Sequence, residues 1–172
     1  MSIGRNSLSM TVLMTPDLAN FSGNVHGGSL LKMLDQVAYA CATRYAKEYV
    51  VTLSVDRVLF REAIHVGELV TFLASVNYTG RTSMEVGIRV EAECIRTGKQ
   101  RHTNSSYFTM VAVDDDSRPV AVPPLTPTTD AGRRRFREAH LRKAANRAAL
   151  GSPHAVPEEE LAALTRGNDS SI

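Results

Sequence analysis

The stretch NVHGGSLLKMLDQ, residues 24–36, begins the helix around which the rest of the chain is expected to fold. That helix is predicted over residues 29–48, because apolar side chains recur there at steps of three and four, which is typical of one buried stripe. The stripe consists of Leu30, Leu34, Val37, Cys41 and Tyr45. Two glycines stand where a capping side chain is usual, and an acid, Asp35, follows two turns later.

The segments around this helix predict an antiparallel sheet. Residues 82–95 alternate most clearly between apolar and charged side chains. Glycine turns at 80–81 and 98–99 join this segment to its neighbours, and turns so short connect antiparallel strands. Strands are expected at 8–14, 50–60, 68–78, 82–95 and 101–113. A strongly curved antiparallel sheet wrapped around one central helix, an α+β fold, buries the apolar face of both.

The end of the chain predicts an extension of a different kind. Prolines in PVAVPPLTP, residues 119–127, are incompatible with a ladder or a helix and predict an extended strap. Residues 130–150 hold seven Lys and Arg against two acids, and they predict a basic helix with Asp130 as its N-cap. Its weak apolar seam would consist of Phe136, His140, Ala144 and Ala148. We therefore expect a compact unit, residues 1–127, and a helical extension, residues 128–172, with a mobile acidic tail.

Composition and simple motifs exclude several classes of protein. The chain has 172 residues and a net charge of +2, which does not call for a nucleic-acid partner. Cys41 and Cys94 lack metal-ligand and CxxC spacing, so we expect free thiols in a reducing compartment and no metal. The first ten residues lack the apolar core of a signal peptide, and no apolar run reaches the roughly 18 residues of a membrane span. A cytoplasmic protein is expected.

Catalytic motifs of the serine and zinc hydrolases are missing from the sequence. It has no nucleophile elbow, no P-loop and no HExxH, so neither type of hydrolase is supported. The basic helix has three interpretations: a solvated face, a lid over an anionic ligand, or a nucleic-acid contact. Phe136 is the one aromatic residue among its basic side chains, which argues against the nucleic-acid contact.

The start of the long helix offers the first candidate site. The main-chain N–H groups of Gly27 and Gly28 have no helical partner and can stabilise an oxyanion, although a Gly-Gly pair can also serve only as a tight turn into the helix. Asp35 can act as general base or nucleophile, or simply face solvent. Seven residues separate Gly28 from Asp35 by roughly 10 Å along the axis. One small carbonyl hardly reaches both, so a two-fold dimer that joins Asp35 of one copy to Asn24, Gly27 and Gly28 of the other is the simplest arrangement.

A second candidate site is the turn Gly80-Arg81-Thr82-Ser83. Small hydroxyl residues, free N–H groups and an arginine can hold a phosphate there, although an ordinary hairpin turn has the same composition. Arg57 lies in an otherwise apolar strand segment, where a surface charge is the alternative to a ligand contact.

Five segments in order resemble the hotdog-fold acyl-CoA thioesterases, in the branch with the cytosolic long-chain and YciA-like acyl-CoA hydrolases. They are GNVHGGSLLKMLD, VTLSVDRVLFREAIHVGELV, YTGRTSMEV, TNSSYFTMVAVD and VPPLTP, and the likeness covers roughly residues 8–127. It implies the hotdog fold, a curved antiparallel sheet around one long central helix, and hydrolysis of acyl-CoA to free CoA and a carboxylic acid. It implies no cofactor, because CoA is part of the substrate.

The resemblance also implies roles for individual residues. Asn24 and Asp35 match the family's catalytic pair, contributed from opposite halves, with the N–H of Gly27 or Gly28 as oxyanion donor. CoA phosphates would be held by Arg57, Arg81, Thr82 and Ser83. A homodimer with shared active sites is expected, assembled further as a trimer of dimers. The alternative is a non-catalytic acyl-CoA sensor, because hotdog domains also serve regulators.

Overall fold

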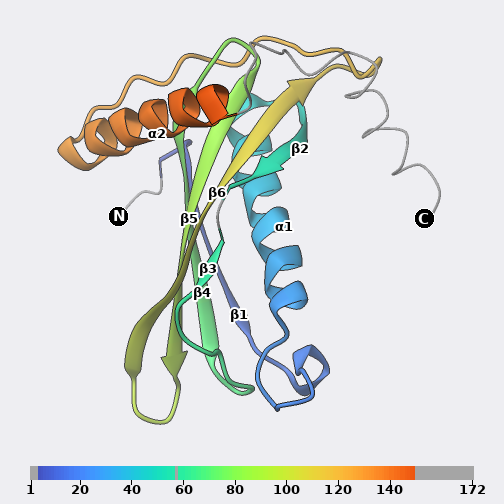
Figure 1. Ribbon diagram of the computed structural model, residues 1–172, viewed down its shortest axis with the longest axis vertical. Coiled ribbons are helices and arrows are strands. Elements are labelled where there is room, and N and C mark those ends of the chain that lie inside the picture. The colour runs from blue at the N-terminus through green and yellow to red at the C-terminus, as the bar shows by residue number, and fades with distance from the viewer. Residues whose placement is uncertain (1–3, 57, 150–172) are drawn as a thin grey trace.

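The computed structural model describes residues 4–56 and 58–149 of the chain (Figure 1). The predicted acidic tail and Arg57 lie outside these described residues. The elements, in order, are β1 (Ser7–Leu13), a short 3-10 helix η1 (Pro16–Leu18), α1 (Gly27–Ala46), β2 (Tyr49–Val55), β3 (Leu59–Phe60), β4 (Leu69–Thr79), β5 (Ser83–Cys94), β6 (Lys99–Val113) and α2 (Asp130–Ala149).

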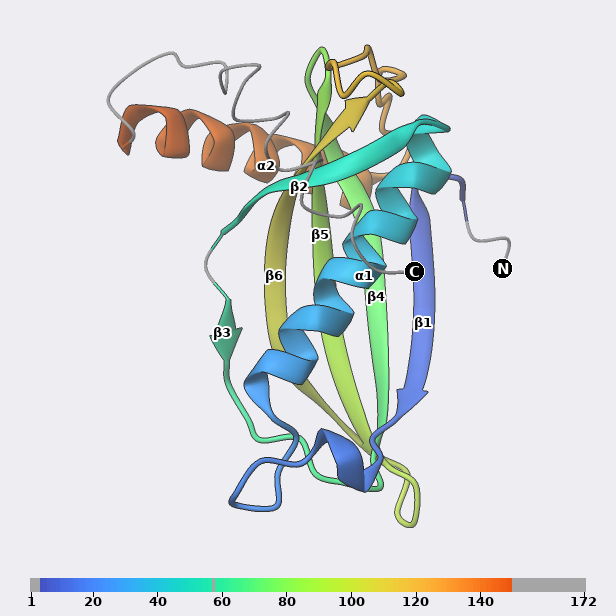
Figure 2. The ribbon, with the colours of Figure 1, turned by 90° about the vertical axis from the view of Figure 1, so that its right-hand side faces the viewer.

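The strands form one antiparallel sheet in the order β1-β4-β5-β6-β2, and β3 pairs separately with β6. α1 runs along one face of the sheet, and α2 crosses one end of the opposite face (Figure 2). The expected architecture, a curved antiparallel sheet around one long helix, is therefore confirmed. The helix begins two residues earlier than predicted, at Gly27.

The core lies between α1 and the sheet. All five residues of the predicted stripe are buried, and Leu34 is 0% exposed. They face the alternating inner positions of the strands, including Val70 and Phe72 of β4 and Val86 of β5, each 0% exposed. Burying one such apolar side chain contributes about 1.5–3 kcal/mol, so this interface positions α1 against the sheet.

The segment predicted as one strand, residues 50–60, is two strands. β2 ends at Val55, and its pairing with β6 shifts register between Thr52 and Ser54. β3 is only two residues long, and Phe60 pairs with Asn104 of β6. An irregularity of this kind bends a strand away from its partner, and alternation alone does not reveal it.

Tyr78 is a second departure from the predicted pattern. Strict alternation along the predicted strand 68–78 would place it on the same face as Val70 and Phe72, but the pairing of β4 with β5 shifts between Val76 and Tyr78. The Tyr78 ring instead lies 5.0 Å from the ring of Phe136 on α2. The irregularity turns this side chain to the opposite face of the sheet.

α2 buries a different set of side chains from the predicted seam. Phe136 is half-buried as expected, and the ring of His140 lies 5.7 Å from that of Tyr78, but Ala144 and Ala148 are exposed. Ala139 is 0% exposed instead. A helix repeats every 3.6 residues, so a run of strict four-residue steps drifts off the contact line.

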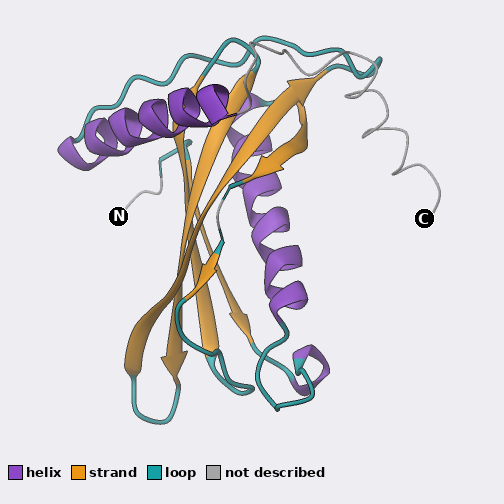
Figure 3. Cartoon of the chain, viewed as in Figure 1, coloured by secondary structure: helices purple, strands orange, loops and turns teal. Residues whose placement is uncertain are grey.

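The strap between β6 and α2 has no regular secondary structure and passes over one end of the sheet, as predicted for its prolines (Figure 3). The N–H of Val122 donates to the carbonyl of Arg81 at 2.9 Å, and the N–H of Leu125 donates to Oγ1 of Thr79 at 2.9 Å. None of the helices in the described part of the chain has the length and apolar character needed to cross a membrane.

Candidate functional site

The N-terminus of α1 has a side-chain cap that was not predicted from the sequence. The Nδ1 atom of His26 accepts a hydrogen bond from the N–H of Gly28 at 2.9 Å. A Cβ on residue 28 would lie 3.1 Å from that Nδ1, which explains the glycine. Within the described residues, the N–H of Gly27 donates to no other group. Of the two predicted oxyanion donors, Gly27 is therefore the one that stays available.

A cavity of about 250 Å³ opens beside this helix end. Asn24 and Gly27 line it together, so the structure brings two of the predicted site residues into one cavity. Its apolar wall includes Leu30 and Phe60, and the ring of Phe60 would lie 3.8 Å from a Cβ on Gly27. Polar donors at one end and apolar walls beside them suit a ligand with a carbonyl and a carbon chain.

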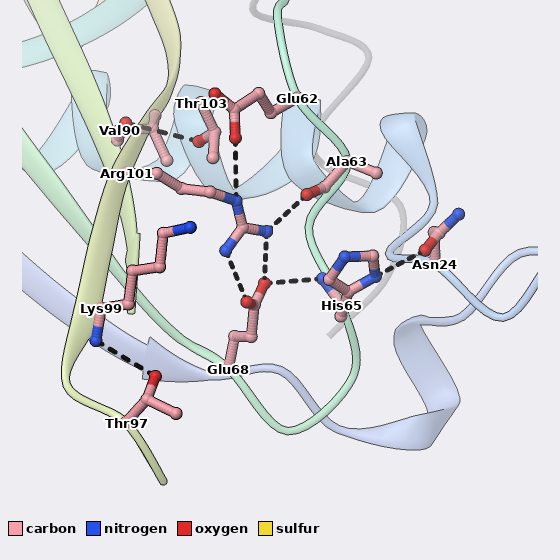
Figure 4. Close-up of polar contacts among 10 residues, drawn as sticks. All are labelled: Asn24, Glu62, Ala63, His65, Glu68, Val90, Thr97, Lys99, Arg101 and Thr103. Atoms are coloured by element: carbon pink, nitrogen blue, oxygen red, sulfur yellow. Dashed lines mark hydrogen bonds and ion pairs between the residues drawn. The ribbon is translucent and has the colours of Figure 1, made fainter. Parts of the chain in front are cut away.

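Asn24 belongs to a chain of polar contacts that reaches β6 (Figure 4). Its Oδ1 lies 2.8 Å from Nδ1 of His65. The main-chain N–H of His65 donates to Oε2 of Glu68 at 2.8 Å, and Arg101 donates to both Glu68 oxygens at 2.5 and 2.8 Å. Arg101 also donates to the carbonyl of Ala63 at 2.6 Å. These contacts fix the segment that carries His65, and so the orientation of the Asn24 amide.

The Glu68–Arg101 pair shifts the pKa of both groups. Hydrogen bonds from Arg101 hold the pKa of the Glu68 carboxyl below its usual value, although burial acts in the opposite direction. Hydrogen bonds to Glu68 raise the pKa of Arg101. Both groups are therefore charged at neutral pH, as a mostly buried ion pair with aligned hydrogen bonds requires.

Asn20 lines the same cavity and was not among the predicted site residues. Its Oδ1 accepts from the N–H groups of Ser22 at 2.9 Å and Asn24 at 3.1 Å. Two acceptor contacts fix the plane of the amide, so its Nδ2 is an oriented donor. The signal was the local pattern Asn-Phe-Ser-Gly-Asn, because an Asn side chain commonly bonds the backbone two residues on.

Asp35 lies in a different cavity, of about 430 Å³, formed with the start of β2. The hydroxyl of Thr52 donates to Oδ1 of Asp35 at 2.6 Å. Asp35 is exposed, and the second carboxylate oxygen forms no hydrogen bond within the described residues. Thr52 was also missed from sequence, where a threonine within the largely apolar run YVVTLSV was the available signal.

The two cavities share no lining residue. Within one chain the structure thus separates Asp35 from Asn24 and Gly27, as the spacing along the helix predicted. Across all described residues, no three histidine, cysteine, aspartate or glutamate side chains come together as a metal ion would require.

The predicted phosphate turn is a hairpin turn between β4 and β5. The N–H of Gly80 donates to the carbonyl of Ser83 at 2.7 Å. Arg81 is exposed, and Thr82 and Ser83 are half-buried. Nζ of Lys143 on α2 lies 3.4 Å from Oγ of Ser83, a contact between residues 60 positions apart that was not predicted from the sequence.

Comparison with known proteins places the chain among thioesterases. A family model described as "Thioesterase superfamily" matches residues 22–103. Protein VdlD of Helicobacter pylori is 52% identical over 139 residues, which cover 81% of this chain and 79% of that protein. A solved apo-hexameric acyl-CoA thioesterase is 35% identical with a TM-score of 0.83, over 86% of this chain and 94% of the other.

A further solved relative is the acyl-CoA hydrolase of Staphylococcus aureus, in complex with butyryl coenzyme A, coenzyme A and coenzyme A disulfide. It is 29% identical with a TM-score of 0.78, over 84% of this chain and 88% of the other. The same hydrolase has been solved as three alanine mutants, of an asparagine, an aspartate 15 positions later, and a threonine 17 positions after that.

Proposed function

We propose, from the premise that this chain belongs to the thioesterase superfamily, that it hydrolyses acyl-CoA to free CoA and a carboxylic acid. Its relatives identify the class of enzyme, an acyl-CoA thioester hydrolase. In this reaction water adds to the thioester carbonyl carbon, the carbon–sulfur bond breaks, and the sulfur leaves as the thiol of CoA after taking a proton. The enzyme must therefore supply a base for water and donors for the carbonyl oxygen.

Asp35 is the proposed general base or nucleophile. Thr52 donates to Oδ1, so that oxygen is oriented and Oδ2 is left to accept from a water molecule or to attack the carbonyl. The observation that carries this proposal is the Asp35–Thr52 contact at 2.6 Å between two residues that line the same cavity. A carboxylate that served only to solubilise the helix would have no need of a fixed hydroxyl partner.

Gly27 is the proposed oxyanion donor. Its N–H lies at the positive end of the α1 dipole, which favours developing negative charge on the thioester oxygen. The N–H of Gly28 is occupied by His26, so this glycine contributes by admitting the cap and leaving its neighbour free.

Two asparagine amides can assist at this end of the site. Asn24, held by His65, is the residue predicted from the family resemblance. Asn20 has the stronger support from spacing, because Asn20, Asp35 and Thr52 reproduce both intervals of the three residues altered in the Staphylococcus hydrolase. We assign Asn20 the contact with the thioester carbonyl or the attacking water, and Asn24 the support of that loop.

A homodimer would bring the two half-sites together. β2 is an edge strand of the sheet, and the apolar side chains on and beside it are 45–51% exposed: Tyr49, Val55, Leu59 and Phe60. An open apolar edge of this kind favours pairing with another chain. A two-fold axis there would give two equal sites, each with Asp35 of one copy and Gly27 of the other. The hexameric relative supports assembly of three such dimers.

The decisive experiment follows free thiol release from acetyl- to palmitoyl-CoA with the wild-type chain and Asp35→Asn. Wild-type turnover and a loss of about 10²–10⁴-fold in the variant are expected for a missing base. A non-catalytic sensor would bind the esters without releasing thiol. Mixing Asn20→Ala with Asp35→Ala chains tests the shared site, because mixed dimers regain one intact site. Activity in the mixture no higher than in either parent would contradict the dimer.

A further inference from the structure

α2 is held firmly on the outer face of the sheet. Ala139 is completely buried against it, and the Phe136 ring packs on Tyr78. Arg142 donates to both oxygens of the largely buried Glu85, at 2.7 and 3.1 Å, and its guanidinium lies 3.7 Å from the centroid of the Tyr107 ring. The buried Ala139 sets the distance of α2 from the sheet, and the bidentate Arg142–Glu85 ion pair sets the rotation of the helix about its own axis.

This docking places Lys143 over the turn between β4 and β5. Its Nζ lies 3.4 Å from Oγ of Ser83 and 5.1 Å from the centroid of the Tyr78 ring. A Cβ on residue 80 would lie 2.8 Å from that Nζ and 3.0 Å from the Ser83 hydroxyl. Gly80 does not have a positive φ. The ammonium therefore lies directly above the main chain of the turn, although as the end of a flexible side chain it could move aside for a larger residue.

The turn and α2 together present the groups that bind phosphate. Arg81 contributes an exposed guanidinium and Thr82 and Ser83 contribute hydroxyls, while Lys143 adds a second cation from a segment 60 residues away. Cations beside hydroxyl and N–H donors are the usual ligands of a phosphate dianion. An ordinary hairpin turn needs no cation from another element above it.

The turn also lies within reach of the proposed base. Ser83 pairs with Val111, and Val111 pairs with Val51, so the three occupy adjacent strands. Two strand spacings are roughly 10 Å. Val51 and Thr52 line the cavity of Asp35. Lys143 reaches the turn from the face of the sheet that carries α2, and Asp35 lies on the face that carries α1 (Figure 2). The pantetheine arm of one CoA molecule would therefore join the two places by passing around the edge of the sheet formed by β2.

We propose that Lys143 completes a phosphate subsite with Arg81, Thr82 and Ser83, and that this subsite takes the phosphates of the CoA nucleotide. The proposal rests on the proposed function of the chain. It makes α2 a substrate-binding element, and it selects the second of the three interpretations of the basic helix, contact with an anionic ligand.

The test compares acyl-CoA with the matching acyl-pantetheine, which has the same thioester and no phosphate. Lys143→Gln is expected to raise KM for acyl-CoA about tenfold, the effect of one lost charge-assisted contact. Its kcat, and both constants for acyl-pantetheine, should match the wild type. Lys143→Arg should restore most of the affinity, and Arg137→Gln, on an exposed position of the same helix, serves as the matched control for net charge.

Binding of CoA itself, by titration calorimetry, keeps the inference separate from catalysis. Lys143→Gln should weaken CoA and leave pantetheine unchanged, whether or not the wild type turns over the chosen ester. Equal losses on acyl-CoA and acyl-pantetheine would assign Lys143 a structural role and overturn the subsite. An unchanged CoA affinity would overturn it as well. Absence of thiol release by the wild type, with CoA binding still dependent on Lys143, would instead refute the proposed function.

Discussion

Replacing Glu68 by Gln should destabilise the chain and disturb the Asn24 end of the site together. The substitution keeps the size of the side chain but removes the charge that Arg101 neutralises. Arg101 reaches Glu68 through two hydrogen bonds of 2.5 and 2.8 Å, with side chains only 19% and 9% exposed. The same carboxylate holds the N–H of His65 at 2.8 Å.

The loss of stability in Glu68→Gln depends on which groups still neutralise or solvate Arg101 in the variant. Removing one partner of a buried ion pair costs about 3–5 kcal/mol. Arg101 keeps some solvent contact, and a second carboxylate, Glu62, lies 3.1 Å from its Nε. We therefore expect a loss of about 2–3 kcal/mol. For a chain of 172 residues this lowers the melting temperature by about 5–10 °C.

The loss should depend on pH in one direction. Arg101 holds the pKa of Glu68 below its ordinary value of 4.5, so the unfolded chain takes up the proton more readily than the folded one. The stabilisation is therefore complete above about pH 4.5 and is lost as the pH falls through the lower folded pKa. Because Glu68→Gln has no carboxylate to protonate, the difference between variant and wild type should shrink under acid.

Thermal melting followed by circular dichroism, at one protein concentration and several pH values, measures both expectations. Asp116→Asn is the matched control, because its ion pair with Arg118 at 3.2 Å is 69% exposed on both sides and should contribute nothing measurable. A Glu68→Gln variant that melts with the wild type at neutral pH would refute the reasoning. A difference that grows below pH 4.5 would refute the sign.

Three further outcomes are expected. Leu34→Ala should lower the free energy of unfolding in urea by about 2–5 kcal/mol, because the side chain is 0% exposed; a smaller loss would contradict tight packing. Burial raises the pKa of Cys41 to about 11, while hydrogen bonds from Thr97 lower that of Cys94; a thiol reagent at pH 8 should therefore label only Cys94, as peptide mass spectrometry would show. Thr52→Val should reduce kcat about tenfold with KM unchanged, and full activity would remove Thr52 from the site.

The regular helices and strands were predictable because a regular spacing of apolar side chains is compatible with only one type of secondary structure. The stripe on α1 and the alternation of β5 each leave a single way to bury the apolar side chains, and β5 was bounded to within one residue at either end. Strict alternation along β4 would place Tyr78 on the wrong face, because a register shift reverses every side chain beyond it. Nothing in an alternating sequence marks such a shift.

The candidate site was predictable only where its residues are close in sequence. Gly27 and Asp35 are noticeable in the sequence because a glycine at the start of a helix and an acid within an apolar helix are both unusual. Thr52 became visible once β2 was placed against α1, and Lys143 once α2 was docked on the sheet. Both contacts join residues far apart in the chain, so local pattern and propensity contain no information about them. His26 is adjacent to Gly27 in the sequence, but its role as a helix cap depends on the orientation of its ring, which the sequence does not show.

In the proposed dimer, the separation of the oxyanion donor Gly27 from the base Asp35 along α1 makes activity depend on dimer formation. A single copy has Asp35 in one cavity and Gly27 in another, with no lining residue in common. Each copy therefore holds a base without its donors and donors without their base. A two-fold axis completes both sites at once or neither. Specific activity should consequently fall on dilution through the dimer's dissociation range, whereas a chain with a complete site of its own would keep constant activity per molecule.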